Sequence, residues 1–282
     1  MAGLGPTKDE PHTVYKLAYF TVLLLTFFTA CSQAPKNPMP TLTAPQTLWL
    51  GERIFANECN LKLPCLTSWN AGEDFPSLGI GHFIWYRAGQ QDSFVESFPA
   101  LLNFYRSAAV PLPQWLETLP GQHSPWQSRA QFLADQDGER LRSLRSFLYD
   151  TRDVQVKFII RRMQASLPIL LANTEKPEEI QSLFYEIANT DAPMGMYALI
   201  DYVNFKGEGA ALSERYDGEG WGLLQVLETL SKNRDQSPLM AQFASAARAV
   251  LARRVANSPS ERNEQRWLEG WNNRTRTYEA QP

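Results

Sequence analysis

The sequence predicts one mostly helical domain with a small β element near its N-terminus, an α+β fold that follows a leader and a tether. Three observations predict it. Apolar residues recur at helical spacing from about residue 94 onward. An extended, glycine-containing stretch ends at residue 86. The composition, 44% hydrophobic and 20% charged over 282 residues, is that of a globular chain with a sizeable core, and it excludes a disordered or fibrous protein.

The charge and the cysteine and histidine contents exclude further classes of protein. A formal net charge of -3 provides no whole-chain basic field for phosphate contacts, so no nucleic-acid partner is expected. Three cysteines are too few for a disulfide-framework fold. Because the chain has three histidines and His12 belongs to the leader, we expect no histidine-based metal site and no cofactor.

The leader is an apolar, uncharged stretch over 17–30 that follows basic residues. It is shorter than the ~20 residues that span a membrane, and it has the length of the apolar region of a signal peptide. It ends in Phe-Thr-Ala-Cys31, which resembles the lipobox of bacterial lipoproteins. The resemblance implies that Cys31 is acylated and anchors the protein in the membrane, and Ser32 after it implies the outer membrane, with the protein facing the periplasm. An uncleaved signal anchor is the alternative.

These observations divide the chain into a lipoprotein signal peptide at 1–30, a proline-rich tether at 31–45 and a folded domain at 46–282. The compartment that the leader implies is oxidising, and close cysteine pairs tend to form disulfides there. We therefore expect a disulfide between Cys59 and Cys65. Two buried free thiols are the alternative if the leader is not a signal.

The elements of the domain follow from local patterns. Thr43 with Pro45 predicts the start of a helix that reaches about Glu58. The helical pattern ends there, and the pattern of residues 77–86 predicts an extended strand. The remaining apolar periodicity predicts helices near 94–108, 125–149, 152–171, 177–189, 193–204, 219–232, 237–256 and 259–279.

The densest chemistry lies around the end of the first helix. Glu58 faces the negative end of the helix dipole, which disfavours its ionised form, so it is a candidate proton donor. A turn further along carries Glu73 and, as the second choice, Asp74. Cleavage of a glycosidic bond by hydrolysis requires such an acid and a second carboxylate that activates water.

This segment resembles the lysozyme-like superfamily. In phage-type lysozymes a glutamate ends the first helix, and a short β-hairpin with an aspartate and a threonine runs into Ile-Gly-Ile-Gly-His. The stretch Ser77-Leu-Gly-Ile-Gly-His82 is similar to the end of that pattern, with Ser77 in the place of the threonine. Glu58 matches the catalytic glutamate by position, and Glu73 falls near the aspartate. The motifs cover 46–86, well under a fifth of the chain.

The resemblance implies a lysozyme-like domain that cleaves the β-1,4 glycan strands of peptidoglycan. Glu58 is then the general acid, and Glu73 and Ser77 are the other candidate catalytic residues. If Glu73 is not catalytic, a single acid remains, as in lytic transglycosylases, in which a hydroxyl of the substrate attacks. The alternative is a non-catalytic lipoprotein that uses the fold to bind the cell wall or a protein partner.

A second segment, 197–226, alternates glycines with charged and aromatic residues, which is typical of a functional loop. Its Gly-Leu-Leu-Gln225 weakly resembles the Gly-Leu-Met-Gln of Slt-type lytic transglycosylases, in which case Glu208 is a rival acid. We expect instead that it contacts the glycan, with a polar loop around a buried tryptophan as the alternative. The candidate substrate-binding residues of both segments are Trp69, His82, Trp85, Tyr202, Asn204, Trp221 and Gln225.

Arginines recur along the last two predicted helices. Glutamates lie near several of them, so we expect solvated faces with local ion pairs rather than a binding site. These arginines are Arg248, Arg253, Arg254, Arg262, Arg266, Arg274 and Arg276.

Overall fold

The computed structural model describes residues 39–92 and 94–280 of the chain. The expected signal peptide at 1–30, the acylation site Cys31 and the first part of the tether lie outside the described residues. A compact unit spans Asn37–Pro282, and all of the helices and strands given below belong to it. Among the residues that are described, no helix has both the length and the apolar content to cross a lipid bilayer.

The first helix, α1 (Ala44–Cys59), begins and ends close to the predicted positions. Thr43 caps its N-terminus: the Thr43 side chain accepts a hydrogen bond from the backbone N–H of Gln46, and the Gln46 side chain accepts one from the backbone N–H of Thr43. The helix ends at Asn60, which takes a left-handed conformation (φ 48°) that asparagine tolerates. These signals are local, which is why the sequence predicts this helix well.

The β element is smaller than the sequence predicts. Its three strands form an antiparallel sheet in the order β1-β2-β3, with Ser77 opposite Ser68 on one side and Ile84 on the other. The single strand expected over 77–86 is wrong in its middle, because Gly79 (φ 68°) and His82 (φ 46°) take left-handed conformations that turn the chain. The elements are η1 (Leu63–Leu66), β1 (Thr67–Ser68), β2 (Ser77–Leu78) and β3 (Phe83–Ile84).

The next part of the chain contains short helices. The single helix expected over 125–149 is two helices, because the chain leaves the helical conformation after Ala134 and enters it again after Gly138. The indole N–H of Trp126 donates to Asp135 at 2.9 Å and so holds the break. The elements are α2 (Phe98–Ser107), α3 (Gln114–Glu117), η2 (Pro120–Gln122), α4 (Arg129–Ala134) and α5 (Glu139–Asp150).

Longer helices form the rest of the chain, and four of them lie within two residues of their predicted bounds. The helix expected over 219–232 begins later, because a two-stranded hairpin precedes it. The C-terminal helix is flanked by 3-10 turns. The elements are α6 (Arg152–Ala172), α7 (Pro177–Asn189), α8 (Met194–Lys206), η3 (Leu212–Glu214), β4 (Arg215–Tyr216), β5 (Glu219–Gly220), α9 (Leu223–Lys232), α10 (Leu239–Asn257), η4 (Ser260–Arg262), α11 (Gln265–Arg276) and η5 (Thr277–Glu279).

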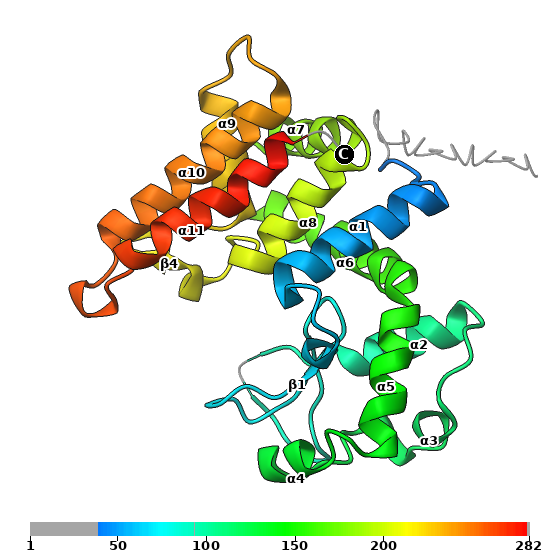
Figure 1. Cartoon of the computed structure of the whole chain (residues 1–282). Coiled ribbons are helices and arrows are strands. Elements are labelled where there is room, and N and C mark those ends of the chain that lie inside the picture. The colour runs from blue at the N-terminus through cyan, green and yellow to red at the C-terminus, as the bar shows by residue number, and fades with distance from the viewer. Residues whose placement is uncertain (1–38, 93, 281–282) are drawn as a thin grey trace, which may run out of the picture. The chain divides into compact units, whose positions relative to one another are not determined.

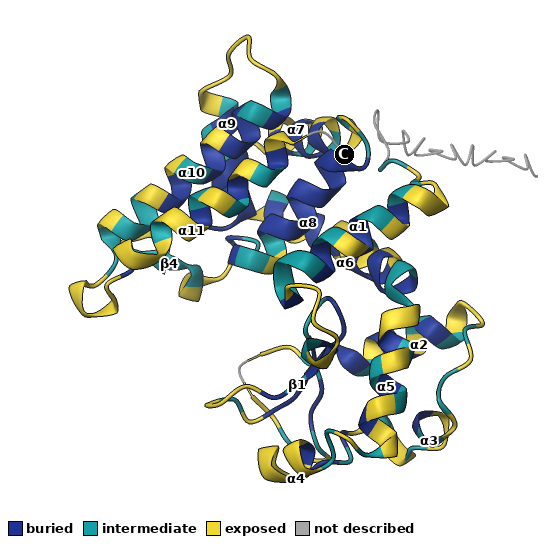
Figure 2. Cartoon of the chain, in the orientation of Figure 1, coloured by how far each residue is buried: buried dark blue, intermediate teal, exposed yellow. Residues whose placement is uncertain are grey.

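Helix α8 is the central helix of this arrangement. Every residue over 194–202 is buried, which requires neighbours on all sides of the helix. Helices α1, α6, α7 and α9 pack against it (Figure 1), and Figure 2 shows most of α8 in the dark blue of buried residues. Asp201 is the one carboxylate in this buried run, so the fold must supply it with partners.

Close packing of α1 on α6 fixes the position of the end of α1. A β-carbon at Gly51 would lie 3.3 Å from Val156 Cγ2 and 3.4 Å from Arg152 Cβ, so the two helices approach closely there. Leu50 and Ile54 of the same helix are buried. The packing of α1 on α6 therefore positions α1, and with it the residues at its C-terminal end.

Candidate active site

Glu58 lies where three parts of the fold meet. Its carboxylate belongs to the last turn of α1 and contacts α11 and the turn between β2 and β3. Oε1 accepts a hydrogen bond from Nη2 of Arg274, and Oε2 lies 3.7 Å from Nδ1 of His82. The Glu58 side chain is 16% exposed, so its carboxylate is oriented by protein groups and is still accessible from solvent.

Asp201 holds Arg274 in place. The guanidinium donates to both carboxylate oxygens, from Nε to Oδ2 at 2.9 Å and from Nη2 to Oδ1 at 2.8 Å. Asp201 also accepts hydrogen bonds from Asn57 Nδ2 at 2.8 Å and from Tyr278 Oη at 2.7 Å. The carboxylate of Asp201, which is 1% exposed, therefore has hydrogen-bond donors at both oxygens. Its bidentate pair with Arg274 fixes the plane of the guanidinium.

The electrostatics of this network favour a permanently charged arginine. Burial lowers the pKa of Arg274, but the hydrogen bonds and charge of Asp201 and then the charge of Glu58 outweigh burial and raise it above its ordinary value. The ring of Phe205 lies 4.4 Å from the guanidinium carbon. Because Asp201 balances the charge of Arg274, the arginine does not need Glu58 as a counter-charge and can serve to position it.

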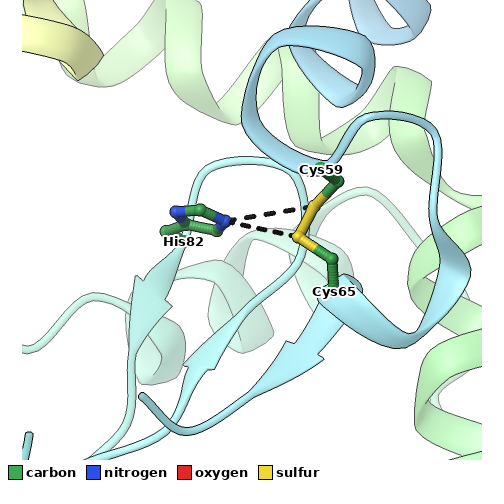
Figure 3. A group of neighbouring side chains, drawn as sticks. All are labelled: Cys59, Cys65 and His82. Atoms are coloured by element: carbon green, nitrogen blue, oxygen red, sulfur yellow. Dashed lines mark hydrogen bonds between the residues drawn. A yellow bond between two sulfur atoms is a disulfide. The ribbon is translucent and has the colours of Figure 1, made fainter. Parts of the chain in front are cut away.

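The structure contains the disulfide between Cys59 and Cys65 that the sequence predicts, directly beside Glu58. Sγ of Cys65 lies 3.6 Å from the backbone carbonyl oxygen of Glu58. Nε2 of His82 lies 3.8 Å from Sγ of Cys65 and 4.0 Å from Sγ of Cys59 (Figure 3). His82 therefore separates the disulfide from the carboxylate and contacts both.

The other two candidate catalytic residues are not brought to Glu58 by any interaction of the described residues. Glu73 lies in a partly exposed turn, where its carboxylate accepts a hydrogen bond from Asn70 Nδ2 at 3.2 Å. Ser77 is 6% exposed within β2, and its backbone carbonyl accepts a hydrogen bond from the Ser68 hydroxyl at 3.3 Å. Of the three candidate catalytic residues, Glu58 is therefore the one whose carboxylate is oriented by contacts from other parts of the fold.

The predicted stacking role of Trp69 and Trp85 is corrected by their burial. Trp85 has no exposed surface, and its indole N–H donates to the carbonyl of Gln122 at 2.7 Å. Trp69 is 5% exposed and meets Phe132 edge-on with ring centroids 5.7 Å apart. Both residues contribute to the core around the β element, and neither offers a face to a sugar ring.

The second segment forms a tightly bonded loop. Tyr202 is fully buried and donates to the carbonyl of Trp221 at 2.9 Å. Gln225 accepts from the N–H of Gly222 at 3.0 Å and donates to the carbonyl of Gly209 at 3.1 Å. Trp221 is 7% exposed. These three candidates therefore support the loop, which corrects their expected role as direct glycan contacts.

Asn204 is the candidate of this segment that is exposed, and it lines a cavity between the β element and the helices. The cavity has a volume of about 80 Å³ and is also lined by Gly81, Phe83 and Glu208. It is smaller than the ~300 Å³ at the lower end of typical ligand sites. Two larger hollows, of about 700 and 720 Å³, are lined by other residues than Glu58.

Lys206, at the end of α8, is a buried amine next to the Arg274 network. Its Nζ lies 3.3 Å from the ring centroid of Trp271 and 4.0 Å from that of Phe205. Burial and then the charge of Arg254 lower the pKa of Lys206 to about 6. Among the described residues no carboxylate forms an ion pair with its Nζ.

Arg274 and Asp201 were not predicted as site residues. The expectation that the C-terminal arginines form solvated faces is wrong for Arg274 and for Arg254, whose side chains are 18% and 13% exposed. Each forms a bidentate pair with a buried carboxylate, Asp201 in one case and Glu264 in the other. A single aspartate within an apolar helix is the signal that could have indicated a buried cationic partner.

In comparisons with protein-family models, curated proteins and solved structures, no match to this chain was found.

Proposed function

We propose that this protein cleaves the β-1,4 glycan strands of peptidoglycan with Glu58 as the general acid. The observation that carries the proposal is the orientation of the Glu58 carboxylate by Arg274 at the junction of α1, α11 and the β2–β3 turn. Protonation of a glycosidic oxygen requires an oriented carboxyl group that carries its proton and is partly accessible from solvent.

The proposed reaction uses one carboxyl group twice. Protonated Glu58 donates its proton to the glycosidic oxygen as the bond to the anomeric carbon breaks. A hydroxyl of the same sugar then attacks the anomeric carbon, and its proton returns to Glu58. Arg274 stabilises the carboxylate between the two steps. The product is an internal ether, lighter than the product of hydrolysis by one water.

The position of Glu73 supports this single-acid route over hydrolysis by an acid–base pair. Its carboxylate is engaged with Asn70 on the turn, and no interaction among the described residues joins it to Glu58. The location remains the one proposed from the leader: an acylated Cys31 would hold the domain at the outer membrane, with peptidoglycan within reach on the periplasmic side.

The test is digestion of isolated peptidoglycan by the purified full-length protein in detergent. We expect soluble fragments whose masses correspond to internal ethers. If the fragments instead have the masses of hydrolysis products, the protein cleaves glycan, but water and not a hydroxyl of the substrate attacks the anomeric carbon. The absence of any fragments, where a control lysozyme digests the same material, would contradict the proposal.

A second function, binding of the cell wall without turnover, is favoured by the position of the two larger hollows. Their volumes of about 700 and 720 Å³ are in the range of ligand sites, and neither is lined by Glu58. If the protein sediments with peptidoglycan and releases no fragments, this second function replaces the first.

A further inference from the structure

His82 lies between a carboxylate and a pair of sulfur atoms. Its Nε2 faces the sulfurs of Cys59 and Cys65, at 4.0 and 3.8 Å (Figure 3). Its Nδ1 lies 3.7 Å from Oε2 of Glu58. In the described part of the chain, the potential ligand atoms of Cys59, Cys65 and His82 all lie within 4.8 Å of one another. The proposed cleavage of glycan gives no role to the two sulfurs or to Nε2.

The three residues have the donor atoms of a zinc site. Thiolate sulfur and imidazole nitrogen bind Zn²⁺ at about 2.3 Å and about 2.0–2.1 Å. In a tetrahedral site these bond lengths place sulfur and nitrogen roughly 3.5 Å apart. The observed separations are a few tenths of an ångström longer. Only the distance between the two sulfurs has to change appreciably, from that of a covalent S–S bond to roughly 3.8 Å.

Glu58 supplies the outer partner that such a histidine usually has. A histidine that binds a metal through one nitrogen commonly donates the N–H of the other to a carboxylate. A metal on Nε2 of His82 would leave the proton on Nδ1, which faces Oε2 of Glu58 at 3.7 Å. A small rotation of the ring closes this distance to a hydrogen bond, and Arg274 holds the carboxylate in place.

The geometry points to a latent metal site formed by Cys59, Cys65 and His82, which becomes available when a dithiol reduces the disulfide and which then binds a thiophilic divalent cation such as Zn²⁺. The dithiol gives up two electrons and two protons, the S–S bond breaks, two thiols form, and the dithiol becomes a cyclic disulfide. Binding of Zn²⁺ releases the two thiol protons. The ligands are then two thiolates and a neutral imidazole, with water in the fourth position.

The fold holds the three ligands together independently of the S–S bond. Cys59 ends α1, Cys65 lies in η1, and His82 follows β2, so each belongs to a different element. The η1 turn contacts α1, α5, β1 and β2. The turn that carries His82 is tightly packed, since a β-carbon at Gly81 would lie 2.5 Å from the ring of Phe83.

The site would also affect Glu58, and this consequence rests on the proposed function. When metal-bound His82 donates to Oε2, both oxygens of Glu58 are engaged, one by Arg274 and one by His82. The carboxyl is then occupied as an acceptor. We expect Zn²⁺ to inhibit the reduced protein and to leave the oxidised protein active.

The experiment is a metal titration of the full-length protein in detergent, before and after reduction by a phosphine, which leaves no competing thiol. Co²⁺ is the optical probe, because thiolate ligands give it intense near-ultraviolet charge-transfer absorption. We expect this absorption to saturate at one equivalent of Co²⁺ in the reduced protein only, and Zn²⁺ to displace the Co²⁺. Far-ultraviolet circular dichroism is expected to show that the reduced protein keeps its helices.

Two variants assign the ligands. His82→Asn tolerates the left-handed backbone at this position and should weaken Zn²⁺ binding at least ~10-fold. His123→Asn, at the exposed histidine of the described chain, is the matched control and should bind as the wild type does. Cys59→Ser with Cys65→Ser should abolish the Co²⁺ absorption although Cys31 is still present.

Three outcomes would overturn the site: no thiolate absorption above that of the double cysteine variant, unchanged Zn²⁺ affinity in His82→Asn, or loss of helical structure on reduction. Failure of the proposed function has a different signature. If metal binds as expected but the oxidised protein never cleaves peptidoglycan, the metal site stands and the assigned activity does not.

Discussion

Arg274 in the last turn of α11 donates a hydrogen bond to Glu58 in the last turn of α1, across 216 positions of sequence. The contact joins the first and last α-helices of the described chain. It also connects the candidate acid to Asp201 in the buried central helix. The orientation of Glu58 therefore depends on the packing of the whole helical body, and the resulting predictions concern both stability and activity.

Arg274→Met is expected to destabilise the protein by about 3–5 kcal/mol, because it leaves the buried carboxylate of Asp201 without its counter-charge. The double variant, with Asp201→Asn added, should recover a large part of this loss. An asparagine at this position is uncharged and can still form hydrogen bonds with Asn57 and Tyr278. Urea unfolding of the wild type, of Arg274→Met and of the double variant measures the effect. Equal destabilisation of the single and double variants would contradict the role of Asp201 as the residue that needs Arg274.

Lys206 is expected to make stability depend on pH between about pH 6 and pH 10.5. Its pKa is lowered from 10.5 to about 6, so between these values the unfolded chain binds a proton that the folded protein does not. The free energy of unfolding should therefore rise with pH across this interval, and the full penalty for burying the ammonium is present only below about pH 6.

The measurement is urea unfolding of Lys206→Met at pH about 6 and about 10, compared with the wild type. The variant should be the more stable at the lower pH, and its advantage should shrink at the higher pH. Lys157→Met, at an exposed lysine paired with Asp153, is the control and should show no such trend. Parallel pH profiles for wild type and Lys206→Met would contradict the expected titration.

Trp85→Ala is expected to act on folding and not on recognition of glycan. The side chain is fully buried and its ring centroid lies 4.7 Å from that of Phe98 and 5.9 Å from that of Trp126. Its removal leaves a cavity that should cost about 3–5 kcal/mol. The partly exposed Trp267, 39% exposed, is the comparison, and its alanine variant should lose much less. If Trp85→Ala has the stability of the wild type but binds peptidoglycan more weakly, the prediction is contradicted and Trp85 is a substrate-binding residue.

The sequence predicts those elements whose signals are local. The Thr43 cap sets the start of α1, and Pro177, which is favoured in the first turn of a helix, sets the start of α7. The predicted 77–86 strand fails where the left-handed backbones of Gly79 and His82 turn the chain, and the predicted 125–149 helix fails over 135–138, between α4 and α5. Apolar periodicity continues across both breaks, so it does not reveal them.

The candidate site is harder to predict because its contacts are distant in sequence. The prediction for Glu58 comes from one short segment, and the prediction of the Cys59–Cys65 disulfide adds only the compartment that the leader implies. Arg274 looks like one of several arginines on a charged helix, and only the tertiary fold pairs it with Asp201. The burial of Trp85 has the same cause, since a tryptophan in a short strand reads equally well as a core residue or as a surface for sugars.

The rate of peptidoglycan cleavage by Glu58→Gln tests the central claim most directly. Glutamine keeps the size of the side chain and can still accept a hydrogen bond from Arg274, but it has no proton to transfer. We expect the rate to fall by roughly 10²–10⁴-fold while the unfolding midpoint stays close to that of the wild type. Glu52→Gln, an exposed glutamate of the same helix, and Glu73→Gln should retain the wild-type rate. A Glu58→Gln protein that cleaves peptidoglycan as fast as these controls would contradict the assignment of Glu58 as the acid.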